Sequence, residues 1–320
     1  MTGATDLATG VRAAVERLTR AGIRSAEVDA VELAAHTLGV EAAELRRLMV
    51  LGGRTLPESF AALVDDRARR IPLQHLTGRA YFRYLTLAVG PGVFVPRPET
   101  EVLVDLALAE IDHLISANDA FEVERGGLPR RSTSNESFAG KGGASVRVVD
   151  LCSGSGAIAL AIKAERPDAV VRGVEVSAEA CAWAVSNRDR LGLDVEIVHG
   201  DATKPCLLDW AGMVDVVTVN PPYIPLGAVP NDPEVRDHDP QIALYGGSDD
   251  GLAIPLQTVA VAVGLLRAGG LLLVEHADVQ GESLPRRMRQ SGAWSAVADH
   301  DDLTGRPRVT SARRADTPTP

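Results

Sequence analysis

The chain has 320 residues, 45% of them hydrophobic and 24% charged, and a formal net charge of −10. This length favours two domains, and the composition is ordinary for a soluble globular protein. The acidic balance opposes the phosphate attraction that drives binding to duplex nucleic acid, so direct nucleic-acid binding is not expected. Cys152, Cys181 and Cys206 show neither disulfide nor zinc spacing, and no metal site is expected.

No uninterrupted apolar stretch approaches the roughly 20 residues that a membrane-spanning helix needs. The N-terminus also lacks the basic-then-apolar plan of a secretion signal. We therefore expect a cytoplasmic protein with no membrane partner. A monomer is also expected.

The first part of the chain shows helical periodicity. From residue 5 to about residue 70, apolar side chains recur at helical spacing, with breaks at Gly22, Gly39 and Gly52-Gly53. This pattern predicts a small antiparallel helical bundle as the first domain, residues 1–76. Such a bundle could recognise a substrate, or it could serve oligomerisation or stability.

Five arginines lie close together near the end of this domain and just after it, at Arg67, Arg69, Arg70, Arg79 and Arg83. They could form a local basic face. The simpler interpretation is a solvated helix end.

A linker over residues 77–98 is predicted to be a β-hairpin. Residues 81–89 alternate in polarity, Gly90-Pro91-Gly92 is a turn signal, and residues 93–95 form a short apolar run. A helix is expected over Glu99–Ile115. Residues 116–145, rich in Gly, Ser, Asn and charge, are predicted to be a mobile insert, with a lid or a partner-binding segment as the alternative.

From Val146 onward, strand and helix signals alternate, which predicts an α/β fold with a mainly parallel sheet in a domain over residues 99–315. The expected strands are 146–151, 170–176, 194–198, 214–219 and 271–276, and the expected helices are 156–165, 178–191 and 250–267. Strand-like residues 294–298 and 309–312 predict a hairpin added at one edge of the sheet.

A glycine-rich turn joins the first of these strands to the first helix. Its candidate cofactor-binding residues are Asp150, Cys152, Ser153, Gly154, Ser155 and Gly156. Glycine lacks the Cβ atom that would keep a ligand away from main-chain N–H groups. Taken alone, the two glycines are as typical of a plain tight turn into a helix.

Residues after the next two strands make a nucleoside cofactor the better hypothesis. Glu175 ends the second strand, where a carboxylate can accept hydrogen bonds from both ribose hydroxyls, and Asp201 and Ala202 follow the third strand, where an adenine edge would lie. The chain has no G-x-x-x-x-G-K-[ST] loop, and the turn lacks G-x-G-x-x-G spacing. S-adenosylmethionine, which carries ribose and adenine but no phosphate, is therefore the predicted cofactor.

Asn220, Pro221, Pro222 and Tyr223 close the apolar strand 214–219 and are the candidate catalytic and substrate-binding residues. The Asn220 side-chain oxygen and the Pro221 main-chain oxygen can accept the two N–H bonds of one planar NH2 group. They would hold its nitrogen in line with a methyl donor. Pro222 stiffens the turn and Tyr223 offers a flat face. A bare Asn-Pro indicates only a turn. This one follows a strand downstream of the cofactor loop, which favours an acceptor site that also borders the cofactor.

At this point the chain resembles the HemK/PrmC family of protein-(glutamine-N5) methyltransferases. The resemblance spans nearly the whole sequence and is carried by the following segments: Arg70-Ile-Pro-Leu-Gln-His-Leu-Thr-Gly78, Phe82, Val95-Pro-Arg-Pro-Glu-Thr-Glu101, residues 150–161, Asn220-Pro-Pro-Tyr-Ile224, residues 243–252 and Leu271-Leu-Leu-Val-Glu275. The second of the long segments, Pro-Arg-Pro-Glu-Thr-Glu, separates this family best from other Asn-Pro-Pro-Tyr enzymes.

The resemblance implies a helical substrate-recognition domain, a hairpin linker and a seven-stranded, Rossmann-like class I methyltransferase domain. It implies that residues 152–156, Glu175, Ala202 and Asn220 line S-adenosylmethionine. Asn220 to Tyr223 would hold the Gly-Gly-Gln glutamine of a class I peptide chain release factor. Cys152 stands where the family usually has Gly, and the insert at 116–145 replaces a short connection. Alternatives are methylation of a ribosomal-protein glutamine, methylation of a nucleic-acid base amine, or a binding module without catalysis.

Overall fold

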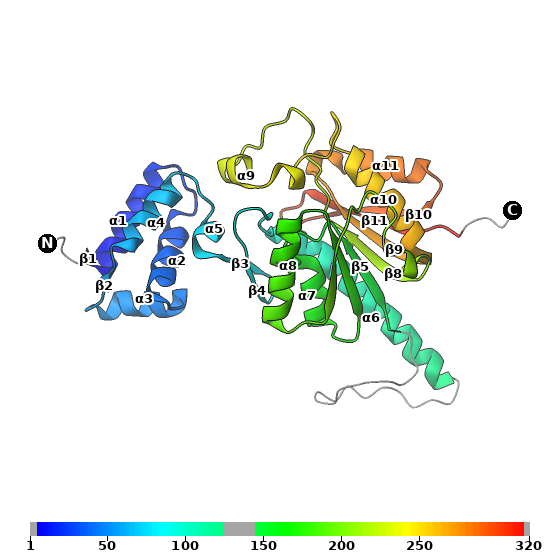
Figure 1. The fold of residues 1–320 in the computed structure, drawn as a ribbon, viewed down its shortest axis with the longest axis horizontal. Coiled ribbons are helices and arrows are strands. Elements are labelled where there is room, and N and C mark those ends of the chain that lie inside the picture. The colour runs from blue at the N-terminus through cyan, green and yellow to red at the C-terminus, as the bar shows by residue number, and fades with distance from the viewer. Residues whose placement is uncertain (1–4, 125–144, 317–320) are drawn as a thin grey trace. The chain divides into compact units, whose positions relative to one another are not determined.

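The computed structural model describes residues 5–124 and 145–316 (Figure 1). The chain divides into two compact units, each with a hydrophobic core of its own. Unit 1 comprises Met1–Ala80, Ala88–Val95 and Val229–Asp239, and unit 2 comprises Tyr81–Leu87, Pro96–Ala228 and Pro240–Pro320.

Unit 1 is helical, as its apolar periodicity predicts. Its helices are α1 (Leu7–Arg20), α2 (Ala26–Leu38), α3 (Ala42–Leu51), α4 (Ser59–Ala68), α5 (Leu73–Thr77) and α9 (Pro233–His238), and a short antiparallel ladder joins β1 (Thr5–Asp6) to β2 (Thr55–Leu56). The Asp6 side chain caps α1 by accepting a hydrogen bond from the Thr9 N–H at 3.1 Å. Leu18, Leu33 and Leu45 are fully buried in the core.

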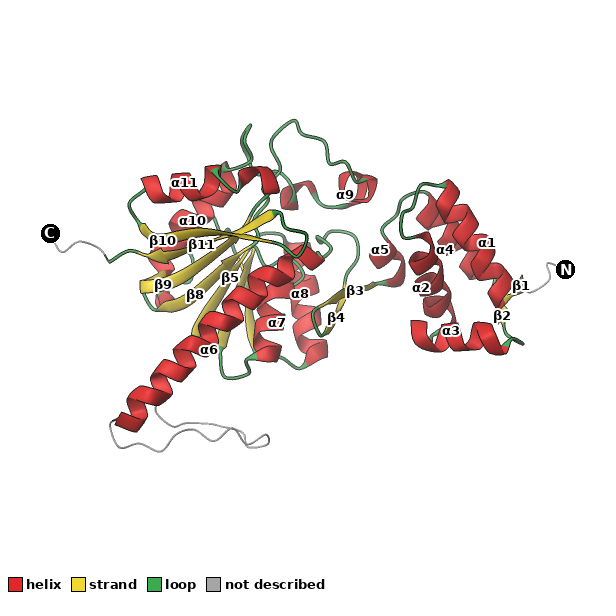
Figure 2. Cartoon of the chain, turned by 180° about the vertical axis from the view of Figure 1, so that it is seen from behind, coloured by secondary structure: helices red, strands yellow, loops and turns green. Residues whose placement is uncertain are grey.

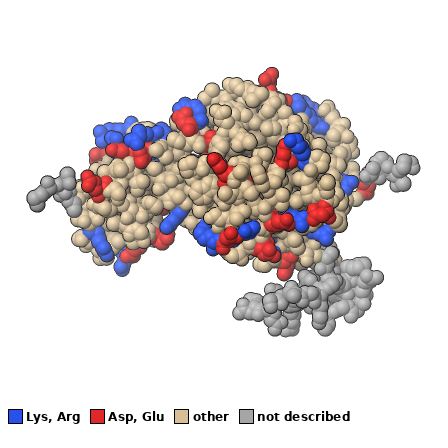
Figure 3. Space-filling view, in the orientation of Figure 1, with Lys and Arg blue, Asp and Glu red and all other residues tan. Residues whose placement is uncertain are grey.

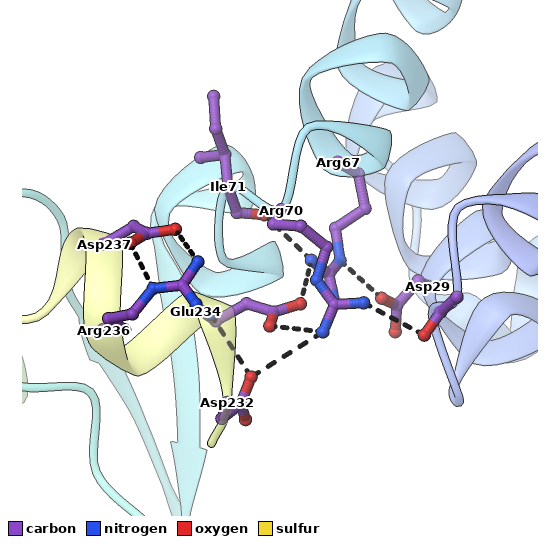
Figure 4. Close-up of polar contacts among 9 residues, drawn as sticks. Asp29, Arg67, Arg70, Ile71, Asp232, Glu234, Arg236 and Asp237 are labelled. Atoms are coloured by element: carbon purple, nitrogen blue, oxygen red, sulfur yellow. Dashed lines mark hydrogen bonds and ion pairs between the residues drawn. The ribbon is translucent and has the colours of Figure 1, made fainter. Parts of the chain in front are cut away.

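The arginines near the end of α4 differ in how far they are exposed to solvent. Arg67 is 6% exposed and donates hydrogen bonds to Asp29 Oδ2 and Glu234 Oε1, both at 2.6 Å (Figure 4). Arg70 donates to Glu234 Oε2 at 2.7 Å. The solvated interpretation is therefore wrong for Arg67 and Arg70, because both side chains are largely shielded from solvent and pair with buried carboxylates. It holds for Arg69, whose side chain is 68% exposed.

The α9 segment is tied to unit 1 by these same charges. Asp232 caps α9 by accepting from the Glu234 N–H at 3.2 Å, and Pro233 occupies the first turn. Burial opposes ionisation of Glu234. Hydrogen bonds, including those from Arg67 and Arg70, have a larger combined effect than burial. They lower the pKa of this carboxyl to about 2. Glu234 is thus ionised at neutral pH and links α9 to α4 (Figure 4).

The predicted hairpin exists, but its turn is elsewhere. β3 (Arg79–Phe82) and β4 (Leu85–Ala88) are joined by Arg83 and Tyr84, and residues 90–95 form no strand. Arg83 has a φ of 51°, and its N–H donates to Glu101 Oε1 at 3.0 Å while its guanidinium pairs with Glu165. These partners hold Arg83 in a conformation that local sequence signals assign to glycine.

Unit 2 contains a seven-stranded sheet with the order β10-β11-β9-β8-β5-β6-β7 (Figure 2). Its strands are β5 (Arg147–Leu151), β6 (Val170–Glu175), β7 (Val195–His199), β8 (Val214–Val219), β9 (Leu266–Glu275), β10 (Trp294–Asp301) and β11 (Pro307–Arg314). Strands β5 to β9 pair in parallel, whereas β11 pairs antiparallel with β9 and β10. The predicted α/β fold, with a C-terminal hairpin at one edge, is confirmed.

Helices cover this sheet. They are α6 (Glu101–Glu124), α7 (Ala157–Glu165), α8 (Ala178–Leu191), α10 (Ala253–Leu265) and α11 (Ser283–Gln290), with short 3-10 helices η1 (Pro98–Thr100), η2 (Leu208–Trp210), η3 (Gln241–Ala243) and η4 (Asp278–Gln280). α6 crosses in front of the sheet in Figure 2 and packs on α7, β8 and β9. α10 also packs on β8 and β9. Strand β8 is buried along nearly its whole length, as is typical of a central parallel strand.

The helix predicted over Glu99–Ile115 continues to Glu124 as α6. Residues 116–124, expected to begin the mobile insert, are thus helical, consistent with the helix formers Ala and Glu among them. Residues 125–144 of that insert lie outside the described residues. Within the described part of the chain, no helix combines the length and the apolar character that crossing a membrane requires.

Candidate active site

Two chain segments meet at the carboxyl edge of the sheet because β5 and β8 are neighbouring parallel strands. Leu151 pairs with Val219 in register, at the roughly 4.8 Å spacing of neighbouring strands, and Cys152 and Asn220 are the residues that directly follow this pair. The Thr218 hydroxyl donates to Asp150 Oδ1 at 2.9 Å and ties the two strand ends together. The glycine-rich loop and the Asn-Pro-Pro-Tyr segment therefore border one site, as parallel strands require.

The glycine-rich loop turns sharply before α7. Gly154 and Gly156 have φ of 55° and 84°, in the left-handed region that favours glycine. The Ser153 N–H donates to Val174 O at 3.0 Å and the Gly156 N–H donates to Ser153 O at 2.8 Å, so the loop is anchored to β6. Ser155 is buried and its carbonyl accepts from Asn187 Nδ2 at 3.1 Å.

The Glu175 side chain holds the glycine-rich loop in place by hydrogen bonding. Its Oε2 accepts from the Gly154 N–H and its Oε1 accepts from the Ser177 N–H, each at 2.8 Å. The side chain is 7% exposed. Each carboxylate oxygen has a further lone pair, so Glu175 shapes the loop and can still accept hydrogen bonds from a ligand.

Asp201 and Ala202 follow β7 at the same edge. Hydrogen bonds from Thr203, then from Lys204, lower the pKa of Asp201 to about 2, so this carboxylate is ionised. Asp201 Oδ1 accepts from the Thr203 N–H at 2.9 Å, and Lys204 Nζ lies 2.9 Å from Oδ2. Ala202 is buried.

Cys152 and Asp150 occupy the strand side of the loop. Cys152 has a φ of 62°, which shows that its backbone adopts the conformation where glycine would be unstrained. Burial raises the pKa of the Cys152 thiol well above its usual range, so it is protonated at neutral pH. Asp150 is fully buried within β5, and burial raises its pKa to about 7. The buried Asp150 carboxyl thus links β5 to β8 through Thr218.

The Asn-Pro-Pro-Tyr segment is braced by a second loop that the family resemblance had singled out, residues 243–252. The Ile224 N–H donates to Leu244 O at 2.7 Å, and the Gly246 N–H donates to Ile224 O at 2.9 Å. A Cβ atom on Gly251, which has a φ of 72°, would lie 2.1 Å from Tyr223 O. The glycines of this motif therefore permit close packing against the backbone that follows Asn220, Pro221, Pro222 and Tyr223, which we call the candidate clamp.

Asn220 and Tyr223 each make a side-chain hydrogen bond within unit 2. Asn220 Nδ2 donates to Thr100 Oγ1 at 3.3 Å, and the Tyr223 hydroxyl donates to Glu275 Oε1 at 3.4 Å, the long end of the hydrogen-bond range. Pro221 and Pro222 are buried. Gln280 Nε2 donates to Tyr223 O at 2.9 Å and to Asp250 O at 2.8 Å.

Sequence reasoning assigned no role to Thr100, Glu275 or Gln280. Thr100 and Glu275 belong to motifs that carry the family resemblance, but nothing in their spacing shows that both reach the clamp. Gln280 lies in no motif noted in the sequence. All three are buried polar side chains, and a buried polar residue is a signal that only the structure reveals.

Comparison with known proteins identifies the family. A PrmC N-terminal domain model matches residues 11–78, and a methyltransferase small domain model matches residues 136–229. Release factor glutamine methyltransferase of Streptomyces coelicolor is 42% identical over 311 residues, covering 95% of this chain and 97% of the relative. The Mycolicibacterium smegmatis protein of the same name is 43% identical over 314 residues, covering 97% and 98%.

A solved structure, TrmN from Thermus thermophilus, covers 53% of this chain and 44% of its own, at 20% identity and a TM-score of 0.39. The family assignment rests instead on the sequence relatives, whose identity extends over nearly the full length of both chains. The chain belongs to the release factor glutamine methyltransferase family.

Proposed function

We propose that the protein transfers a methyl group from S-adenosylmethionine to the side-chain amide nitrogen, N5, of the Gly-Gly-Gln glutamine in class I peptide chain release factors. This activity would support translation termination in the cytoplasm. Family membership supports the reaction class and the substrate. One structural observation carries the mechanism: the β5–β8 register places the glycine-rich loop beside Asn220.

The residues at this edge fit the proposed cofactor. A Cβ atom added at Gly154 would meet nothing within 4 Å, so the main chain there is open to a ligand. Glu175 would accept the two ribose hydroxyls, Asp201 would accept the exocyclic amine of adenine, and Ala202 would leave room for the ring. Residues 152–156 would line the remainder. When bound, the cofactor supplies a methyl group on a positively charged sulfur.

Asn220 Oδ1 and the Pro221 main-chain oxygen would accept the two N–H bonds of the substrate amide. An amide nitrogen delocalises its lone pair, so acceptors that favour a pyramidal, increasingly positive nitrogen lower the barrier. Pro222 would keep the turn rigid, and Tyr223 would offer a flat face to the planar amide. The nitrogen loses its proton to solvent after transfer, so this scheme needs no strong general base.

Mass spectrometry tests the proposal. Purified protein incubated with labelled S-adenosylmethionine and a class I release factor should add a single methyl group to the Gly-Gly-Gln glutamine. A release factor with this glutamine replaced should stay unlabelled. Asn220→Ala should lower kcat by roughly 10²- to 10³-fold, the usual effect of removing one such hydrogen-bonding group. An unmodified release factor beside a labelled ribosomal protein would refute the assignment.

Methylation of a nucleic-acid base amine is the alternative that the same clamp could serve. The net charge of −10 opposes it, and on the visible face of the molecule acidic and basic side chains are interspersed (Figure 3).

We further propose that unit 1 recognises the release factor. The alternative for unit 1 is a role in oligomerisation, which predicts a change in solution mass when the unit is mutated.

A further inference from the structure

A line of polar contacts runs from the candidate clamp to a buried acid. Asn220 Nδ2 donates to Thr100 Oγ1 at 3.3 Å. Hydrogen bonding by the Thr100 side chain is in turn one of the effects that oppose the rise in the pKa of the Glu275 carboxyl. Thr100 is 4% exposed and Glu275 is 2% exposed. The line starts on the turn after β8, passes through η1 and ends at the last residue of β9, so it joins three separate segments of unit 2.

Glu275 ends this line as a hydrogen-bond acceptor. Its Oε1 accepts the Tyr223 hydroxyl at 3.4 Å, and its Oε2 is buried and has no hydrogen-bond partner among the described residues. The nearby cation, Arg308, donates hydrogen bonds to Asp302 Oδ2 and His276 O, each at 3.2 Å. The Glu275 carboxylate therefore depends on the Thr100 and Tyr223 hydroxyls to offset its burial.

The direction of these hydrogen bonds determines which way the Asn220 amide points. An ionised carboxylate only accepts hydrogen bonds, so the Thr100 hydroxyl donates its hydrogen bond to Glu275 and its oxygen lone pairs face Asn220. Those lone pairs can accept only from the NH2 end of the Asn220 amide. The opposite end, Oδ1, is then free to accept from a substrate. The reverse orientation would present NH2 to the substrate amide NH2, which are two donors.

We propose that Glu275, acting through Thr100, is a positioning residue that fixes the orientation of the Asn220 carboxamide, committing its NH2 to Thr100 and presenting Oδ1 to the substrate nitrogen. This inference rests on the proposed function. It assigns a physical role to two motif residues that sequence reasoning left without one, Thr100 of Pro-Arg-Pro-Glu-Thr-Glu and Glu275 at the end of β9.

We call the line of contacts from Glu275 through Thr100 to Asn220 the relay. Turnover should depend on pH because Glu275 can be protonated. Burial raises the pKa of Glu275 to about 7, against the opposing effects of Thr100, Arg308 and Tyr223, and the negative charge of Glu99 raises it further. Arg97, whose charge acts on Tyr223, is the other cation of this environment. Protonated Glu275 becomes a donor, which frees the Thr100 hydrogen and removes the preference for one amide orientation. Turnover should therefore rise with pH through about 7.

Thr100→Val and Thr100→Ser test the relay with side chains of similar size. Valine removes the hydroxyl that connects Glu275 to Asn220, and we expect kcat to fall about 10- to 100-fold, as for misplacement of a reacting group. Serine keeps the hydroxyl and should restore kcat to within about threefold of the wild-type value. Thr258→Val is the matched control, because Thr258 is fully buried in α10 and donates only to Pro255 O at 2.8 Å. This control should keep wild-type turnover.

A second readout does not depend on activity. The side-chain NH2 resonances of Asn220, identified by their loss in Asn220→Ala, should shift with pH around 7 in the wild-type protein. They should shift far less in Glu275→Gln, which removes this titrating carboxyl and leaves Asp150, whose pKa is also about 7, in place. In Thr100→Val they should move to positions typical of a solvated amide.

Several results would contradict the proposed orientation of the Asn220 carboxamide. Wild-type turnover in Thr100→Val, equal loss in Thr100→Ser, or equal loss in Thr258→Val would overturn the relay. So would Asn220 resonances that ignore both pH and the Thr100 substitution. If the wild-type protein leaves every release factor unmodified, the proposed function fails. The Asn220 resonances then still report whether Glu275 orients this amide.

Discussion

At the residue level, two buried carboxyl groups have pKa values well above those of exposed carboxyl groups. Burial raises the pKa of Asp150 from 3.8 and of Glu275 from 4.5, in each case to about 7. At pH values between the unfolded and the folded pKa, the folded protein binds protons that the unfolded chain releases. The resulting stability is fully present below the unfolded pKa values and is lost as pH rises through about 7. Ionised Glu275, which the relay requires, is therefore the less stable form.

Glu275→Gln should expose this cost. The variant stays neutral, so its free energy of unfolding relative to that of the wild type should increase as pH rises from about 5 to about 8. The expected change is on the order of 1–3 kcal/mol, from the free energy equivalent of a shift of this size. Urea denaturation at several pH values measures it. A difference between the two proteins that stays constant with pH would contradict the prediction.

At the level of elements, the turn after β8 keeps its shape through the loop packed against it. Gly251→Ala would place a Cβ atom 2.1 Å from Tyr223 O and 3.0 Å from Pro225 N, at a φ of 72°. We expect a loss of about 2–4 kcal/mol in the free energy of unfolding and a parallel loss of turnover, because backbone atoms must move.

Gly264→Ala is the matched control for this substitution. Gly264 lies in α10, and a Cβ atom there meets nothing within 4 Å. Alanine should leave activity intact and stabilise the helix by about 0.5–1 kcal/mol. Thermal denaturation of both variants distinguishes them, and equal destabilisation would refute the proposed bracing of the clamp.

The buried ion cluster of unit 1 is a second test at this level. Arg67→Met leaves Asp29 and Glu234 buried without their shared cation, at an expected cost of about 3–5 kcal/mol in the free energy of unfolding. Arg69→Met removes an exposed arginine two residues away and should change it by less than about 0.5 kcal/mol. Chemical denaturation compares them. Similar values for the two variants would show that the cluster contributes nothing.

Elements whose signal is local could be predicted from the sequence. The apolar run Val214–Val219 and the glycine-rich turn place β8, β5 and the site between them, because parallel strands share one carboxyl edge. Elements fixed by distant partners could not. The turn at Arg83 depends on Glu101 and Glu165, and α9 depends on Arg67 and Arg70. The amphipathic helix α11 was missed although Leu284 and Met288 have the spacing of one buried face.

At the level of the whole molecule, the division into two units explains why the 229–239 segment escaped prediction. This segment directly follows the clamp and its supporting turn in sequence, yet its contacts belong to unit 1. The chain thus leaves unit 2 after Ala228 and returns at Pro240. Chain order indicated a continuous domain over residues 99–315. Charge pairing between Arg67 and Glu234, 167 positions apart, is invisible to periodicity.

Two separate cores also predict how the molecule responds to its cofactor. S-adenosylmethionine at about 100 times its Kd should stabilise the unit that binds it by about 2.7 kcal/mol. Hydrogen exchange should slow in β5 and β8 of unit 2, while amides around Leu18 and Leu33 in the core of unit 1 keep their rates. In Arg67→Met the unit 1 amides should exchange faster, and β5 and β8 should still respond to the cofactor. Equal protection of both cores by S-adenosylmethionine would show instead that the two units open as one.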